Sequence, residues 1–127
     1  MKPMVSPVPN FLFQAGRVAI GTGFVVDPDR AGAGWVGPGQ AVADGGVMAR
    51  AFGVRDVALG VATIAAKSHR SGYRTLLALG VLCDAVDCAA TVAAGDRIPP
   101  EARKVTAAVA AAAALNGLLL LARESAG

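Results

Sequence analysis

Aromatic and charged side chains are scarce in this chain of 127 residues. Only 5% of the residues are Phe, Trp or Tyr. Charged residues make up 17%, against roughly 25% in soluble domains. So few aromatic rings give no stacking surface for single-stranded nucleic acid, and no basic cluster with interleaved aromatics accompanies the net charge of +3. We therefore expect no nucleic-acid partner.

Histidine and cysteine are also scarce, at one and two residues. His69 alone cannot supply the two axial ligands of a membrane haem, and no C-x-x-C pair exists for thiol redox chemistry or zinc. Cys83 and Cys88 are five positions apart, which on a helix separates them by about 140° around the axis, so they should not bridge. We expect neither a metal site nor a cofactor.

Apolar runs, in contrast, are abundant, and 54% of the residues are hydrophobic. Residues 104–123 form an almost unbroken apolar run of about twenty residues, long enough at ~1.5 Å per residue to cross ~30 Å of hydrocarbon. The sixteen glycines and the alanine runs suit membrane helices, whose backbones approach closely through small residues. The sequence thus predicts an integral membrane protein.

We expect an all-α, four-helix transmembrane bundle with short loops, forming a single domain over residues 1–127. The glycine-rich segment 27–45 is predicted to be an interfacial loop, with Trp35 and Tyr73 as headgroup anchors. A short basic turn makes the second and third helices antiparallel neighbours, and Pro100 opens the last helix. The expected spans are about 10–26, 46–66, 73–94 and 101–123.

Lysine and arginine in the short flanks favour, by five to four, placing both termini and the second loop in the cytoplasm. The first span contains an arginine and no small-residue cleavage site follows it, so we expect it to be retained. The alanine- and arginine-rich composition predicts a bacterial, multi-pass protein of the cytoplasmic (inner) membrane, surrounded by membrane lipids. Flat faces of small residues such as 108–114 suit a homodimer.

Charged residues interrupt the expected spans, where each costs at least about 2.5 to 3.5 kcal/mol unless it is paired or hydrated. Counting ~1.5 Å per residue from the turn at His69 puts Arg55 level with Asp84 and Arg50 level with Asp87. This spacing predicts two Arg–Asp rungs between the second and third helices. The charged residues are Arg17, Arg50, Arg55, Asp56, Asp84 and Asp87.

Neutral polar residues surround these charges. Either Arg55 or Asp56 should face the third helix while the other faces Arg17, because adjacent helical residues point about 100° apart. Gln14 and Asn116 would add donors and acceptors from the first and last helices. The second helix also carries a small and polar stripe, which consists of Gly53, Asp56, Gly60 and Thr63.

Three acids and three bases permit two interpretations of the cluster. Complete pairing would simply fix the register of the helices. Ionisable residues inside a membrane equally indicate a functional site. We therefore favour a membrane module that binds a lipophilic small molecule or a protein, with ligand-binding residues Arg17, Arg50, Gln14 and Asn116.

Two other functions remain open. An acid/base enzyme of the epoxide hydrolase, cyclase or isomerase type could act on a lipophilic substrate if Asp84 and Asp87 shared one proton and an arginine stabilised the anion. Its candidate catalytic residues are Asp84, Asp87, Arg55 and Asp56. A proton or small-ion path would require an oligomer, because four short helices leave little room for one.

Two families share motifs with the chain. Asp44 to Arg50 followed by Asp84 to Asp87 is similar to the acidic signature of CDP-alcohol phosphatidyltransferases, but the spacings differ and the chain is too short for six helices. The motifs Gly53-Val-Arg55-Asp56 and Asp84-Ala-Val-Asp87, together with Arg17, resemble those of uncharacterised small four-helix integral membrane proteins. That resemblance implies the four-helix fold and the polar cluster, and it implies no activity.

Overall fold

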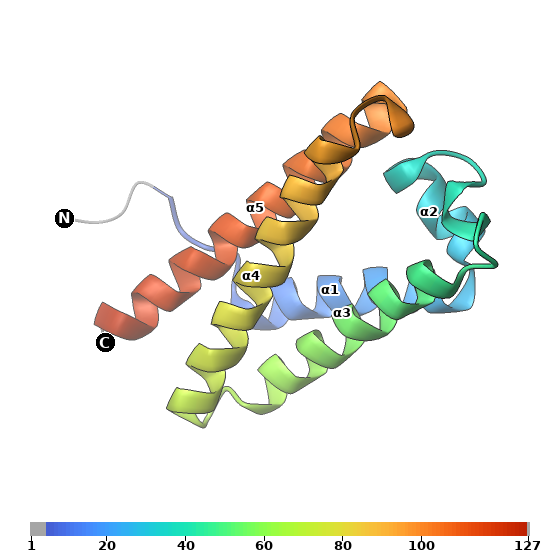
Figure 1. Cartoon of the computed structure of the whole chain (residues 1–127). Helices are drawn as coiled ribbons and strands as arrows, with labels where there is room; N and C mark the ends of the chain where they lie inside the picture. The colour runs from blue at the N-terminus through green and yellow to red at the C-terminus, as the bar shows by residue number, and fades with distance from the viewer. Residues whose placement is uncertain (1–4, 127) are drawn as a thin grey trace.

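The computed structural model describes residues 5–126, which are helical throughout their regular structure and contain no strand (Figure 1). The bounds of the four long helices agree with those of the four predicted helices to within one turn. A fifth, shorter helix follows the first. The elements are α1 (Asn10–Val26), α2 (Pro28–Val36), α3 (Val47–Ala65), α4 (Arg70–Ala94) and α5 (Pro100–Ala126), with 3-10 turns η1 (Gln40–Val42) and η2 (Gly95–Arg97).

The predicted interfacial loop is wrong for residues 28–36, which form α2. Asp27 accepts a hydrogen bond from the Arg30 N–H at 3.2 Å, and Pro28 lies in the first helical turn. Both residue types favour a helix start in these positions. Asp27 also closes α1 through its own N–H, so the Asp-Pro pair that marks the end of one helix begins the next.

The long helices pack as two pairs, α1 against α3 and α4 against α5, and the pairs diverge from each other (Figure 1). The expected close packing of α3 and α4 is limited to a short part of their lengths. The start of α1, the α3–α4 turn and the end of α5 lie at one end of the molecule. Segment α2–η1 and the α4–α5 turn lie at the other end.

Glycine permits the close approach of α1 and α3. A Cβ placed on Gly53 would lie 2.5 Å from the carbonyl oxygen of Gly21, and a Cβ on Gly21 would lie equally close to the carbonyl oxygen of Gly53. A Cβ on Gly60 would meet the Val18 side chain at 2.6 Å. The predicted small and polar stripe of α3 is therefore confirmed as the buried face of that helix.

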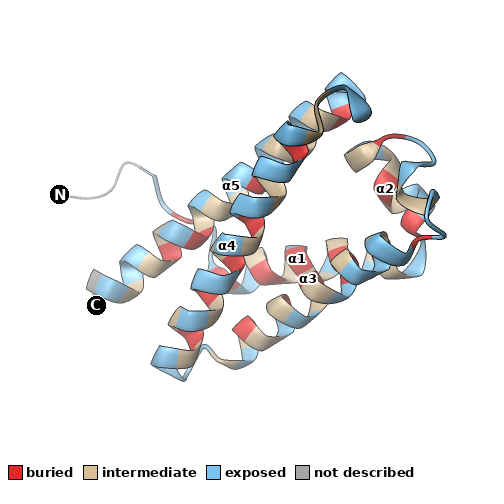
Figure 2. Ribbon diagram, viewed as in Figure 1, coloured by how far each residue is buried: buried red, intermediate tan, exposed pale blue. Residues whose placement is uncertain are grey.

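Helices α4 and α5 pack through larger apolar groups and through Gly117, where a Cβ would lie 2.6 Å from the Val81 side chain. Tyr73, Leu77 and Leu120 form a buried cluster near one end of the pair. Figure 2 shows that buried residues elsewhere form short patches along the helices, separated by exposed surface. The molecule therefore has no single continuous apolar core among its described residues.

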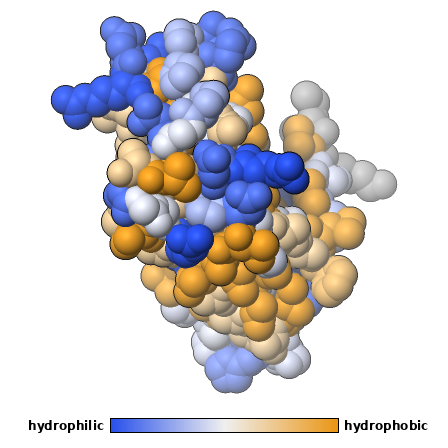
Figure 3. Space-filling view, turned by 90° about the vertical axis from the view of Figure 1, so that its right-hand side faces the viewer, coloured by the Kyte–Doolittle hydropathy of each residue, from blue (hydrophilic) through white to orange (hydrophobic). Residues whose placement is uncertain are grey.

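Two helical segments, Arg70–Arg97 and Pro100–Ser125, are long and apolar enough to cross a membrane. Only 17% and 22% of their most apolar windows are buried within the molecule, so most of their apolar surface faces outward, as Leu82 and Leu118 illustrate. On the face in Figure 3, hydrophobic side chains form a broad area below a hydrophilic upper end. A core helix of a soluble protein would bury this surface instead.

Candidate functional site

Arg17 and Asp84 form a buried, two-pronged ion pair. The Nη1 and Nη2 atoms of Arg17 donate to Oδ1 and Oδ2 of Asp84 at 2.9 and 2.6 Å. Each of the two side chains is at most 8% exposed. A two-pronged contact of this kind matches the planar guanidinium to the carboxylate. Because Arg17 lies on α1 and Asp84 on α4, the pair connects the two helix pairs.

Arg55 and Asp87 form a second connection between the pairs. The Nη1 and Nη2 atoms of Arg55 donate to Asp87 at 3.1 and 2.5 Å, and Nη2 also donates to Oδ1 of Asp56 at 3.3 Å. Asp56 in turn lies 3.7 Å from Arg17. The prediction that one of Arg55 and Asp56 faces the third predicted helix, which is α4, and the other faces Arg17 is confirmed. Asp56 thus links the two ion pairs into one network.

The predicted rungs are wrong. Arg55 pairs with Asp87 rather than Asp84, because both carboxylate oxygens of Asp84 are bound by Arg17 of α1. Gly80, one turn before Asp84, lies beside that side chain, and a Cβ there would be in ordinary van der Waals contact with Arg17 at 3.5 Å. Arg50 does not join the network. It donates to the carbonyl oxygens of Val25 at 3.2 Å and Gly45 at 3.3 Å, on the exposed side of the molecule.

Of the two neutral polar residues, Gln14 lies in the network and Asn116 does not. The Gln14 carbonyl oxygen accepts from Nε of Arg17 at 3.3 Å, and its amide donates to buried Asn10 at 3.1 Å. Asn116 instead binds the backbone of Val8: its Oδ1 accepts from the Val8 N–H and its Nδ2 donates to the Val8 carbonyl oxygen. Asn116 therefore attaches the segment before α1 to α5.

Two phenylalanines lie against the arginines. The guanidinium carbon of Arg17 lies 5.2 Å from the ring centre of Phe13, and that of Arg55 lies 4.8 Å from the ring centre of Phe52. These distances suit cation–π attraction. Nε of Arg55 is buried and has no hydrogen-bond partner among the described residues.

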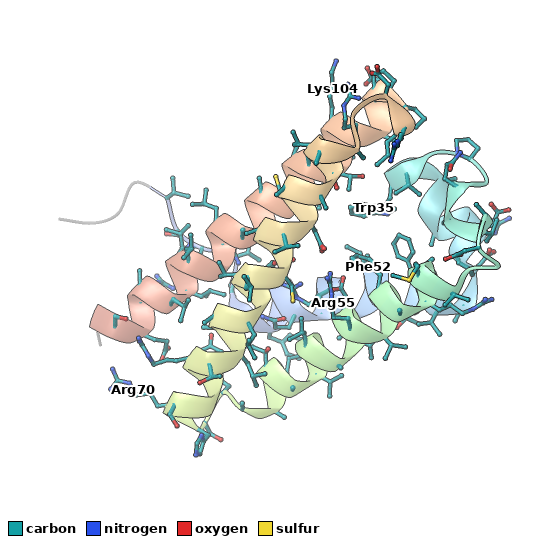
Figure 4. The ribbon with its side chains drawn as sticks, viewed as in Figure 1. Trp35, Phe52, Arg55, Arg70 and Lys104 are labelled. Atoms are coloured by element: carbon teal, nitrogen blue, oxygen red, sulfur yellow. The ribbon has the colours of Figure 1, made fainter. Side chains whose placement is uncertain are left out.

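A cavity of about 730 Å³ lies between the helix pairs, with the charged network on its wall. Figure 4 shows Phe52 and Arg55 projecting from α3 toward α4, and Trp35 projecting from α2 toward the same space. Exposed side chains such as Met48 also line the cavity, so it is open to the surroundings. The most buried charged residues of its lining are Arg17, Asp56 and Asp84, and the Asp87 side chain is 26% exposed.

Segment α2–η1 closes one end of the cavity. Trp35 is half-buried there, its ring centre 6.2 Å from that of Phe24, and its carbonyl oxygen accepts a 2.7 Å hydrogen bond from Thr106 of α5. The sequence interpretation missed this wall because it treated the segment as a loop. The Asp27-Pro28 capping signature was the signal that could have revealed it.

Asp44 lies at the same end, just before α3. Its carboxylate accepts hydrogen bonds from the N–H groups of Gly46 at 2.9 Å and Met48 at 3.1 Å. These bonds, the Met48 bond foremost, lower the pKa of Asp44 below its ordinary value. The carboxylate therefore satisfies two backbone donors at the start of α3.

The cysteines and the histidine lie outside these contacts. Cys83 and Cys88 are both free, which confirms that they do not bridge each other. His69 is exposed and caps α4 by accepting the Gly72 N–H on Nδ1 at 3.1 Å.

The fold and the site define a class of protein: an all-helical chain with two helices capable of crossing a membrane, and a buried Arg–Asp network beside an open cavity. No family model, curated protein or solved structure matches the chain.

Proposed function

We propose that this protein is a multi-pass protein of the cytoplasmic (inner) membrane that binds a lipophilic small molecule in the cavity between its helix pairs. The cavity itself carries the proposal. Its volume of about 730 Å³ falls within the ~300 to 1,000 Å³ of typical small-molecule sites, which are largely apolar with a few polar groups.

The outer surface supports a membrane location. Apolar side chains on α4 and α5 face outward, including Leu79, Leu82, Leu115 and Leu118. In a bilayer these faces would contact lipid, whereas α1 and α3 would place their charges against each other and against α4. Leu12 and Met48, at the exposed part of the cavity lining, would then provide an apolar entrance from the lipid.

An acid/base enzyme is the second candidate function. Asp87 favours it, since this carboxylate lines the cavity and 26% of its side chain is exposed. However, Asp84 and Asp87 each accept two hydrogen bonds from a different arginine. The two carboxylates are therefore engaged separately, without the direct contact that would make them share a proton, and binding is the better-supported function.

A cavity-filling variant tests the proposal. Gly16 of α1 lines the cavity, and a Cβ there would meet nothing within 4 Å, so Gly16→Phe should place a ring in the cavity without disturbing the helix contacts. The matched control is Ala19→Phe, on the same helix, exposed and outside the cavity lining.

The measurement is native mass spectrometry of protein released from lipid nanodiscs, with bound small molecules identified by fragmentation. We expect a molecule to accompany the wild type and Ala19→Phe, and to be lost from Gly16→Phe. Equal retention by all three proteins would show that the cavity is not the binding site.

A further inference from the structure

The buried network carries more negative than positive charge. Its members are two arginines, Arg17 and Arg55, and three aspartates, Asp56, Asp84 and Asp87. The sequence alone suggested three arginines, but Arg50 is bound to backbone carbonyls on the outer side of α3. The network therefore holds one carboxylate beyond what its arginines neutralise.

Asp56 is the carboxylate with the fewest contacts. Only its Oδ1 accepts a hydrogen bond, from Arg55, and Arg17 approaches the same oxygen at 3.7 Å. No hydrogen bond from the described residues reaches Oδ2. The Asp56 side chain is only 7% exposed and forms part of the cavity wall. A largely buried carboxylate with incomplete pairing is costly, and a positive charge in the cavity beside it would offset that cost.

The rest of the cavity favours an organic cation. Trp35 lines it with no guanidinium of the described residues over its ring, whereas Phe13 and Phe52 are already engaged by Arg17 and Arg55. Phe24 is buried and packs edge-on against Phe52, with ring centres 4.9 Å apart. Aromatic faces attract ammonium-type cations, and carboxylates complete such sites. At the mouth, Asp44 and Arg97 carry opposite charges and leave the balance unchanged.

We propose that the cavity selects a lipophilic organic cation, whose positive group lies beside Asp56 and whose apolar part contacts the aromatic and aliphatic wall. This inference rests on the proposed function and specifies its ligand class.

The test compares two probes of the same shape and opposite charge, tetraphenylphosphonium and tetraphenylborate. Each is titrated into wild-type protein in phosphatidylcholine nanodiscs by isothermal calorimetry, with empty nanodiscs as the reference for partitioning into lipid. We expect saturable binding of the cation, at least about tenfold tighter than that of the anion. Equal affinities, tighter binding of the anion or no saturable binding of the cation would overturn the inference.

Variants then locate the charge. Asp56→Asn should weaken cation binding about tenfold, and Asp56→Glu should restore it. Asp29→Asn removes an exposed carboxylate of α2 outside the cavity lining and should bind as the wild type does. Unchanged cation affinity in Asp56→Asn would contradict the inference. If Asp56→Asn does not fold, the two-probe comparison on the wild type decides by itself.

Failure of this inference can be separated from failure of the proposed function. If the anion binds as well as the cation and Gly16→Phe abolishes both, the cavity binds lipophilic molecules without the proposed charge preference. If neither probe binds and no molecule accompanies the purified protein, both proposals are wrong.

Discussion

The two helix pairs are held together in different ways. Helices α1 and α3 approach through glycine, so that the backbone at Gly21 and Gly53 is in direct contact. Helices α4 and α5 pack mainly through side chains, with Tyr73, Leu77 and Leu120 as their buried cluster. The first pair carries the two arginines of the charged network, Arg17 and Arg55, while the second exposes apolar side chains such as Leu82 and Leu118. The comparison shows that one pair, α1 and α3, is joined by a close backbone contact, whereas the other pair, α4 and α5, is joined by an apolar cluster of side chains.

Charged side chains form two of the connections between the pairs, Arg17–Asp84 and Arg55–Asp87. Phe13 of α1 also packs against the apolar cluster of α4 and α5. Hydrogen bonds of Thr106 to Trp35 and of Asn116 to Val8 add further connections to α5. The network thus stabilises the arrangement of the pairs and also forms the wall of the cavity between them. Variants that remove one kind of contact should separate these contributions.

The largest effect should come from Asp84→Asn. This substitution removes the two-pronged carboxylate partner of buried Arg17 and leaves Asp56, at 3.7 Å, as its nearest carboxylate. The loss should be about 3 kcal/mol of unfolding free energy, at the lower end of the range for breaking a buried ion pair. Unfolding in mild detergent, followed by circular dichroism, measures the loss. The double variant Arg17→Met with Asp84→Leu should recover part of it, because both charges of the buried pair are removed together, while Asp56 keeps Arg55 as its partner. A double variant no more stable than Asp84→Asn would contradict this account.

The glycine contact should come next. Gly53→Ala places a Cβ against the Gly21 carbonyl oxygen and should destabilise the α1–α3 pair by about 1 to 3 kcal/mol. Gly16→Ala on α1 is the control, since its Cβ meets nothing within 4 Å and alanine is the better helix former. The same unfolding measurement applies. Equal stability of the two variants would mean that α1 and α3 are not in contact at Gly53.

Asp87→Asn should have a smaller effect than Asp84→Asn. The Arg55–Asp87 pair is more exposed, at 32% and 26% of its side chains, so we expect a loss of about 1 kcal/mol or less. Added salt should reduce the loss, because exposed charges are screened more than buried ones. A loss as large as that of Asp84→Asn would show that both pairs are equally shielded.

The smallest effect should come from Asp44→Asn. Because folding lowers the pKa of Asp44, the carboxylate stabilises the fold at a pH above its unfolded pKa, and this contribution disappears as the pH falls through the folded value. The variant should therefore melt slightly below the wild type at neutral pH and together with it in strong acid. Melting curves at several pH values measure the difference. A difference that persists in acid would contradict the assignment.

The sequence determined the four long helices and five of the charged residues in the network, Arg17, Arg55, Asp56, Asp84 and Asp87. Apolar runs bounded by proline and glycine marked the four long helices, and the i, i+3 spacing of Asp84 and Asp87 put both carboxylates on one face of α4. The glycine stripe of α3 was likewise readable, since Gly53 and Gly60 are seven positions apart, about two turns.

The tertiary structure decided which charges meet. Counting residues along α3 and α4 predicted Arg55 opposite Asp84. The sequence, however, does not show how α1 lies against α4. In the structure Arg17 of α1 binds Asp84. The packing of the helices also decides that Arg50 donates to backbone carbonyl oxygens and that Asp56 accepts a single hydrogen bond, from Arg55. Ion pairing depends on the distance between side chains from different helices, and this distance is set by packing rather than by position along the chain.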